Sequence, residues 1–288
     1  MKFLTLFVLI LIFPIPAASA NLDADEDIPK MEKVEIEQYS LNPVESLFID
    51  EGKLKQLVAS LEKKVYIAPE NARINETGEI IDGEPGTMLD KEEFHRTFRD
   101  AFYSDQQEKV LDIPVKDVFP KVNRELLEDI SSNKLGSYYT SFNQNNKERS
   151  HNISLAAEAI NNYVVFPGES FSFNEVVGER TMEKGYKRAP VIVKGELAED
   201  IGGGICQVSS TLFNAVDLKG IQIIERYAHS KEVPYVPPGK DAAVSWWGPD
   251  FVFKNIYNQP LLIRAAAKNG NLMVSIYSSN TADFFKGD

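Results

Sequence analysis

The sequence predicts an α+β protein of two domains, and three observations lead to that prediction. Apolar residues recur at helical spacing in short segments such as Leu54–Leu61 and Ile153–Ile160. Nearer the C-terminus, short apolar runs alternate with turn residues, and Asn269-Gly270 between two of them is a strong hairpin signal. The chain has 288 residues, enough for two ordinary domains. We therefore expect a mainly antiparallel C-terminal sheet rather than a doubly wound parallel one.

Residues 1–20 have the pattern of a secretory signal peptide. Lys2 precedes an apolar run, Phe3–Ile15, and the small residues Ala18-Ser19-Ala20 form a cleavage site. The run is shorter than the roughly 20 residues that a membrane span needs. We therefore expect a mature chain that begins at Asn21, has no integral membrane domain after signal cleavage, and is secreted or associated with the cell envelope. The alternative is that the segment is kept as an uncleaved anchor.

The first part of the exported chain reads as a tether followed by a small domain. Residues 21–42 are acidic and lack an apolar period, which favours a solvated tether. Residues 43–120 are predicted to form a small α+β domain. Its expected elements are a helix after Asp50, a strand at 65–68, a hairpin with arms at 72–75 and 79–81, a helix after Asp90, and a strand at 109–115. Asp90 is the expected N-cap of the second helix, with Glu93 three residues on, and Phe94, Phe98 and Phe102 lie on one face of that helix.

A second, longer domain is predicted for residues 151–280, with a C-terminal tail at 281–288. The polar residues 121–150 are expected to connect the two domains. The expected elements of the second domain are a helix at 153–160, a strand at 164–166, a helix after the glycines at 202–204, strands at 221–227, 242–247 and 250–257, and a hairpin around 269–270.

Composition excludes several classes of function. The 31 Lys and Arg residues against 43 Asp and Glu residues give a net charge of −12, which argues against binding to nucleic acid, whose phosphates dominate affinity. One cysteine and three histidines leave too few ligands for a zinc site of several thiolates or a histidine-rich metal centre. We therefore expect neither a metal nor a cofactor.

The segment with the clearest chemical potential is Asp200–Phe213. Three glycines, Gly202 to Gly204, precede a helical pattern, so Cys206 falls in the first turn of a helix. The positive end of a helix lowers the pKa of a thiol, and the thiolate is the nucleophilic form. The backbone amides of Gly203 and Gly204 are candidates to stabilise an oxyanion. The alternative is a buried structural cysteine behind a tight helix start.

A nucleophilic cysteine needs a base, and His229 is the preferred candidate because its strand follows the cysteine helix directly. His151, near the start of another helix, is the competing base. Asp241 is the preferred residue to orient the His229 ring, ahead of Asp250.

Five further residues are candidate substrate contacts. Arg180 and Arg226 suit bidentate binding of a carboxylate, although scattered basic residues are often only surface residues. Gln207 and Ser209 follow the cysteine on its helix, and Trp246 is expected to line a ligand groove, with a half-buried strand residue as the alternative.

The motifs themselves resemble a known family. The residues that carry the resemblance are 167–174 (PGESFSFN), 178–181 (GERT), 185–186 (GY), 200–213 (DIGGGICQVSSTLF), 226–230 (RYAHS) and 241–244 (DAAV). Together they resemble the VanW family over about residues 125–280. The segment 43–120 resembles the peptidoglycan-binding domain that often precedes VanW domains.

The resemblance implies an exported bacterial cell-wall protein with peptidoglycan as its partner. Some VanW-domain proteins act as L,D-transpeptidases, which implies that Cys206 attacks the carbonyl of meso-diaminopimelate in a tetrapeptide stem and releases D-alanine. His229 would then assist the amine of a second stem. Two alternatives stay open. One is a non-catalytic envelope protein that binds peptidoglycan or a partner, such as an accessory of glycopeptide resistance, and the other is a cysteine amidase or peptidase.

Overall fold

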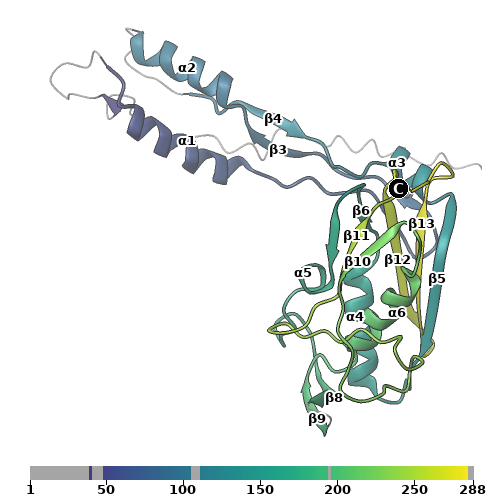
Figure 1. Ribbon diagram of the computed structural model, residues 1–288. Helices are drawn as coiled ribbons and strands as arrows, with labels where there is room; N and C mark the ends of the chain where they lie inside the picture. The colour runs from purple at the N-terminus through teal and green to yellow at the C-terminus, as the bar shows by residue number, and fades with distance from the viewer. Residues whose placement is uncertain (1–38, 41–47, 105–110, 194–195, 285–288) are drawn as a thin grey trace, which may run out of the picture. The chain divides into compact units, whose positions relative to one another are not determined.

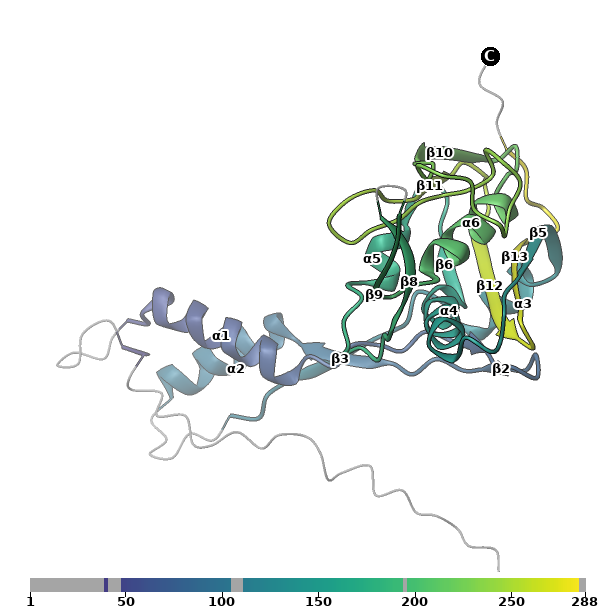
Figure 2. The same cartoon turned by 90° about the horizontal axis from the view of Figure 1, so that it is seen from below.

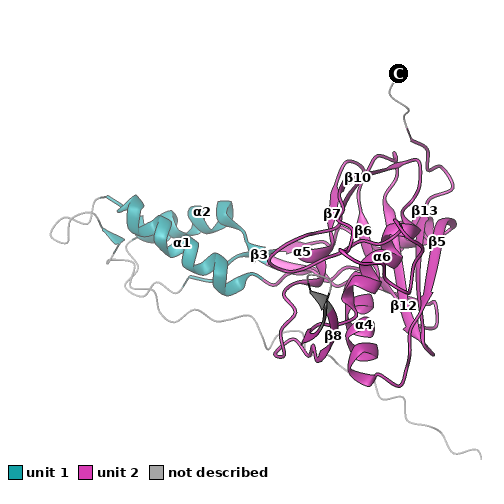
Figure 3. Cartoon of the chain, turned by 60° about the horizontal axis from the view of Figure 1, so that its bottom comes forward, with its two compact units in different colours: residues 1–66, 88–116 teal, residues 67–87, 117–288 magenta. Residues whose placement is uncertain are grey.

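The chain forms two compact units, which Figure 3 distinguishes by colour. The computed structural model describes residues 39–40, 48–104, 111–193 and 196–284. Unit 1 comprises residues 1–66 and 88–116, and unit 2 comprises residues 67–87 and 117–288. The predicted signal peptide lies outside the described residues, as does most of the predicted tether. Tyr39, near the end of that tether segment, packs edge-on against Phe98 of unit 1.

Two helices, α1 (Glu51–Val65) and α2 (Lys91–Tyr103), build unit 1. Each begins at a predicted aspartate: the Asp50 carboxylate accepts the amides of residues 52 and 53, and Asp90 accepts that of Glu93. Their apolar faces share one core, which contains Leu54, Leu61, Phe94 and Phe98. Both predicted helices are therefore confirmed.

The strand predicted at 65–68 is wrong. Val65 is the last residue of α1 and is buried in the core of unit 1, four residues after Leu61 on the same helix face. Packing on that face outweighs the strand preference of a β-branched side chain. Only Ile67 makes a bridge, to Thr87.

The strand predicted at 109–115 is displaced. Residues 105–110 lie outside the described residues, and the observed strand is β4 (Val115–Val118), which pairs with β3 (Gly86–Leu89). Leu111 and Ile113 are buried in the unit 1 core without joining a strand. Pro114, which has no N–H to donate, precedes the observed strand.

The first hairpin has the predicted arms and belongs to unit 2. β1 (Arg73–Ile74) and β2 (Ile80–Ile81) pair antiparallel around a turn in which the Asn75 side chain accepts the amides of Thr77 and Glu79. Ile74 packs in a small core that also contains the buried residues Leu127, Ile130 and Leu262.

Residues 121–150, expected to be a polar connection, contain a helix, a strand and the first turn of α4 (Lys147–Ile160) instead. α3 (Arg124–Ile130) begins at Asn123, whose side chain accepts the amide of Leu126, and β5 (Asn133–Ser141) follows. β5 is an edge strand, and it pairs with β13 along its whole length. Because most of its outward-facing residues are polar, the sequence shows no clear strand pattern here.

The main sheet of unit 2 has four antiparallel strands in the order β5-β13-β12-β6. β6 (Tyr163–Val165) and the hairpin of β12 (Leu261–Lys268) and β13 (Asn271–Ser278) occur where the sequence predicts strands. Asn269 and Gly270 have φ of 52° and 73°, the left-handed conformation that a tight hairpin turn requires. Two helices, α4 (Lys147–Ile160) and α6 (Ile205–Ala215), pack against this sheet and each other (Figures 1 and 2).

A second sheet has the order β10-β11-β7, formed by β10 (Ile221–Glu225), β11 (Val252–Asn255) and β7 (Ser170–Ser172). The short helix α5 (Phe173–Val177) follows β7, and the hairpin of β8 (Arg188–Val193) and β9 (Glu196–Ile201) leads into α6. In the core, the Phe171 and Phe253 rings stack with centroids 5.0 Å apart.

The strand predicted at 242–247 is wrong. Only Ala243 makes a bridge, to Tyr227, and the flanking backbone is bound by side chains instead. The Ala242 amide donates to Ser210 Oγ at 2.9 Å, and its carbonyl accepts from Ser209 Oγ at 2.6 Å. Hydrogen bonds from helix α6 therefore take the place of a strand ladder. No helix in the described part of the chain is both long and apolar enough to cross a membrane.

Candidate active site

A glycine loop joins β9 to α6 and places Cys206 in the first turn of the helix, as the sequence predicts. Gly202 and Gly204 have φ of +85° and +109°, a conformation that side chains other than glycine rarely adopt. A Cβ on Gly203 would lie 2.5 Å from the carbonyl oxygen of Ala189 in β8. Gly204 is the N-cap of α6 and supplies no side-chain cap.

The same glycines make room for two arginine side chains. A Cβ on Gly202 would lie 3.1 Å from Cβ of Arg180, and one on Gly204 would lie 3.0 Å from Cγ of Arg149. Both contacts would be tight, so the absence of side chains lets the two arginines pack against the loop that precedes Cys206.

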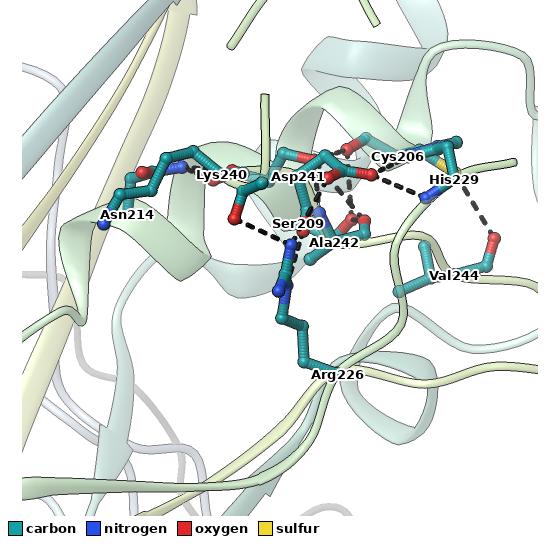
Figure 4. A network of polar contacts seen from close by, with 11 residues as sticks. Cys206, Ser209, Asn214, Arg226, His229, Lys240, Asp241, Ala242 and Val244 are labelled. Carbon is teal, nitrogen blue, oxygen red and sulfur yellow. Dashed lines mark hydrogen bonds and ion pairs between the residues drawn. The ribbon is translucent and has the colours of Figure 1, made fainter. Parts of the chain in front are cut away.

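Cys206 lies where its thiol contacts both a histidine and a backbone carbonyl. Sγ donates a hydrogen bond of 3.4 Å to the carbonyl oxygen of Val244 (Figure 4). Burial alone would raise the pKa of the thiol, but the hydrogen bond with His229 and the charges of His229 and Arg180 lower this pKa below its ordinary value. These contacts favour the reactive thiolate.

Asp241 holds His229 by two hydrogen bonds to one carboxylate oxygen. The ring Nδ1 and the backbone N–H of His229 both lie 2.6 Å from Oδ2 of Asp241. Because Nδ1 is bound to the carboxylate, Nε2 is the ring nitrogen left to contact Cys206. The structure thus brings together the three residues that the sequence singled out as nucleophile, base and orienting carboxylate.

The charges of these three residues reinforce one another. Burial would lower the pKa of His229, but its contacts with Cys206 and Asp241 raise this pKa above the ordinary value. Burial would raise the pKa of Asp241, but the two hydrogen bonds from His229 lower it. The arrangement therefore favours a thiolate, an imidazolium and a carboxylate in one row.

Arg226 contacts Asp241 rather than the space beside the thiol. Its Nε donates to the Asp241 backbone carbonyl at 2.7 Å, and its Nη2 lies 3.3 Å from Oδ1, the carboxylate oxygen that His229 does not use. The guanidinium also lies over the Phe213 ring, 4.7 Å from its centroid. In this position Arg226 orients Asp241, whereas the sequence prediction made it a substrate contact.

A cavity of about 570 Å³ opens beside Cys206. Five further predicted site residues line its wall with the cysteine: Arg180, Gly204, Gln207, His229 and Trp246. Gly203 and Ser209 do not line it. Gly203 faces β8, and the Ser209 hydroxyl is buried against the carbonyls of Cys206 and Ala242.

The competing candidates lie elsewhere in unit 2. His151 Nε2 lies 2.9 Å from the carbonyl oxygen of Gly185, and Asp250 accepts hydrogen bonds from the Ser172 hydroxyl and the Asn174 amide. Neither residue lines the cavity. Their hydrogen bonds hold loops and α5, and His229 with Asp241 is the pair that meets the thiol.

Two cavity residues were missed in the sequence. Arg149 lies in the stretch expected to be a connection, and its Nη2 donates to Oε1 of Gln207 at 2.9 Å. Tyr235 lies in the loop between β10 and β11, and burial together with the nearby Cys206 charge raises the pKa of its hydroxyl well above the ordinary value. The prolines Pro234 and Pro237 around Tyr235 are the only local signal that this aromatic residue is held in place.

Comparison with known families supports both resemblances seen in the sequence. Residues 148–277 match the family described as "VanW like protein", and residues 35–111 match the family described as "Putative peptidoglycan binding domain". The first match contains Cys206, His229, Asp241 and the whole cavity except Asn146.

Two curated proteins are similar to this chain. The Bacillus subtilis "Uncharacterized protein YoaR" is 55% identical over 232 residues, which cover 81% of this chain and 76% of that protein. The Enterococcus faecalis "Vancomycin B-type resistance protein VanW" is 37% identical over 84 residues, 29% of this chain and 30% of that protein. No solved structure matches.

Proposed function

The chain belongs to the VanW family, and from that membership we propose that it is a cysteine acyl-transferase of the L,D-transpeptidase type. The two family matches make it a cell-wall-associated protein with an extracytoplasmic location and with peptidoglycan as its partner. The observation that carries the finer proposal is the row formed by Cys206, His229 and Asp241 at the wall of the cavity.

In the proposed first step, the Cys206 thiolate attacks the carbonyl carbon of meso-diaminopimelate in a tetrapeptide stem. His229 Nε2 holds the proton from the thiol, and the bond from sulfur to carbon gives a tetrahedral oxyanion. The oxyanion collapses, the amide bond to D-alanine breaks, and His229 gives its proton to the departing amine. A thioester on Cys206 and free D-alanine result.

In the second step, the side-chain amine of another stem attacks the thioester carbonyl. His229 accepts a proton from that amine, the carbon–sulfur bond breaks, and a 3-3 cross-link forms while the thiolate–imidazolium pair is restored. Asp241 stabilises the imidazolium and fixes the ring so that Nε2 faces the sulfur in both steps.

The oxyanion needs hydrogen-bond donors close to the thiol. We assign this role to the backbone amide of Gly204, at the positive end of α6, and not to that of Gly203, which faces β8. Gly204 lines the cavity, which supports this assignment. The amides of Ile205 and Gln207 are taken up by the carbonyls of Gly202 and Gly204 and are therefore not counted among the donors.

Product analysis tests the proposal directly. Purified protein is incubated with disaccharide-tetrapeptides, and the products are compared by mass spectrometry with those of the Cys206→Ala variant. We expect 3-3-linked dimers and free D-alanine from the parent alone. Free tripeptide without dimers would identify a hydrolase, because water would have replaced the amine. No product from a folded parent would favour a non-catalytic envelope protein that binds peptidoglycan.

A further inference from the structure

Two hydrogen-bond donors in the cavity wall have no partner among the residues that the structure describes. Nη1 of Arg180 and Nε1 of Trp246 are buried atoms, and neither makes a hydrogen bond within the described residues. Both residues line the cavity beside Cys206. A buried donor without a partner has lost its hydrogen bond to water and gained none in return, so such atoms are rare unless a ligand completes them.

The two arginines in this wall have no carboxylate partner among the described residues. Arg180 Nη2 donates to the Asn174 side-chain oxygen at 2.7 Å, and Arg149 donates to that of Gln207 at 2.9 Å, so both partners are neutral amides. In the described part of the chain, no carboxylate lies within salt-bridge distance of either guanidinium. The charges of Cys206 and Asp250 favour the Arg180 cation, and the charge of Cys206 favours that of Arg149, but neither guanidinium forms an ion pair with a carboxylate of the described residues. Both can therefore take a negatively charged ligand.

Two acidic residues, Glu179 and Asp200, line the same cavity, but neither neutralises these arginines. The Asp200 carboxylate accepts the amide of Ile201 at 2.8 Å, and the side chain is exposed.

We propose that Arg180 and Trp246, with Arg149 beside them, form a subsite for the C-terminal carboxylate of the stem peptide, the one that leaves with D-alanine. This inference rests on the proposed acyl transfer at Cys206. Guanidinium and indole N–H groups can only donate hydrogen bonds. A carboxylate offers them two acceptor oxygens, and its negative charge pairs with the positive charges of Arg149 and Arg180.

The chemistry of the leaving group fits this location. In a tetrapeptide stem, the terminal carboxylate is separated from the attacked carbonyl carbon by only the amide nitrogen and one carbon atom. Its binding site must therefore lie in the same cavity as the nucleophile, as Arg180 and Trp246 do. The subsite makes the enzyme select stems that end in a free D-alanine carboxylate.

A matched pair of substrates tests the subsite. The disaccharide-tetrapeptide with a free C-terminal carboxylate is compared with the same compound carrying a C-terminal amide, and kcat/KM is measured for the parent, Arg180→Gln and Trp246→Phe. We expect the parent to prefer the acid by at least about 30-fold. Arg180→Gln should remove most of that preference, chiefly through a higher KM for the acid, and Trp246→Phe should reduce it severalfold. Arg73→Gln, at an exposed arginine of β1, is the matched control and should keep the full preference.

A binding experiment separates failure of the subsite from failure of the proposed reaction. Calorimetric titration of Cys206→Ala and of Cys206→Ala combined with Arg180→Gln uses the same two peptides and needs no turnover. If the parent is inactive but Cys206→Ala binds the acid more tightly than the amide, the acyl-transfer proposal fails and the subsite stands. If Arg180→Gln does not fold, Trp246→Phe decides the question.

Three results would overturn the subsite. The parent could treat acid and amide alike, or Cys206→Ala could bind neither peptide. Arg180→Gln could also lower kcat/KM equally for both substrates, which would mean that Arg180 stabilises the oxyanion or the fold rather than the carboxylate.

Discussion

His229 and Asp241 are joined twice, because the ring Nδ1 and the backbone N–H of the histidine both lie 2.6 Å from the same oxygen, Oδ2. One carboxylate therefore sets the position of the chain at residue 229 as well as the orientation of its ring. The other oxygen, Oδ1, faces Arg226. Arg226 thus holds Asp241, and Asp241 in turn positions His229, the base of the proposed reaction.

Replacing Asp241 by asparagine should lower kcat for tetrapeptide cross-linking by about 10²–10⁴-fold. The amide keeps the shape of the side chain but removes the charge that stabilises the imidazolium, and it can present an N–H to the ring. Steady-state kinetics check this. Asp217→Asn is the control, since Asp217 only pairs with Lys240 at an exposed position, and it should leave kcat unchanged. Equal activity of the two variants would contradict the role given to Asp241.

The pH dependence of thiol alkylation should report the lowered pKa of Cys206. A thiolate persists at every pH above its pKa, so the rate with iodoacetamide should stay high well below pH 8.5, the region of an ordinary thiol, and fall only as pH drops through the lowered pKa. In His229→Gln the hydrogen bond and charge of His229 are lost while burial remains. The thiolate should then form only at a higher pH than in the parent. A parent profile that coincides with that of a free cysteine would argue against the thiolate–imidazolium pair.

Arg226 should act through Asp241 and not on the substrate. Arg226→Gln removes the hydrogen bonds that orient Asp241. We therefore expect kcat to fall by about tenfold with little change in KM, and the pH profile of Cys206 alkylation to move to higher pH. Arg180→Gln should instead raise KM for stems with a free carboxylate. A rise in KM alone for Arg226→Gln would show that Arg226 binds substrate, as its sequence position first indicated.

The glycine loop should tolerate no side chain at residue 204. An alanine there would combine the strain of a φ of +109° with Cβ contacts of 3.0 Å to both Arg149 and Ile153. We expect Gly204→Ala to reduce the free energy of unfolding by about 2–3 kcal/mol in urea titrations. Gly78→Ala, also in unit 2, carries a φ of +90° but has no atom within 4 Å of its Cβ, so it should cost only about 1 kcal/mol. Equal losses would mean that backbone strain alone explains the glycine.

Local signals in the sequence predict much of this fold. The Asp90 cap, the Asn269-Gly270 turn and the helical pattern after Gly204 each depend on neighbours within a few residues, and the structure confirms all three. The errors arise where distant contacts decide. β5 is a strand because β13 pairs with it, and residues 242–247 are not one because the hydroxyls of α6 bind their backbone.

In the candidate site, too, the residues with a local signal were predicted and those placed by distant contacts were missed. The sequence predicts Cys206, His229 and Asp241, since the cysteine follows a glycine loop and the other two lie on the next segments of the chain. Arg149 was missed because its place beside Gly204 depends on the packing of α4 against α6, which no local pattern shows. Tyr235 was missed because a loop residue enters a cavity only through the fold as a whole.

The central claim is that Cys206 forms a thioester with a stem peptide, and intact-protein mass spectrometry tests it most directly. A disaccharide-tetrapeptide whose diaminopimelate side-chain amine is acetylated can donate an acyl group but cannot accept one. We predict that the parent gains the mass of this compound minus D-alanine, that peptide mapping places the added mass on Cys206, and that Cys206→Ala gains none. The claim would be contradicted by a folded parent whose Cys206 is readily alkylated but which neither gains this mass nor releases D-alanine.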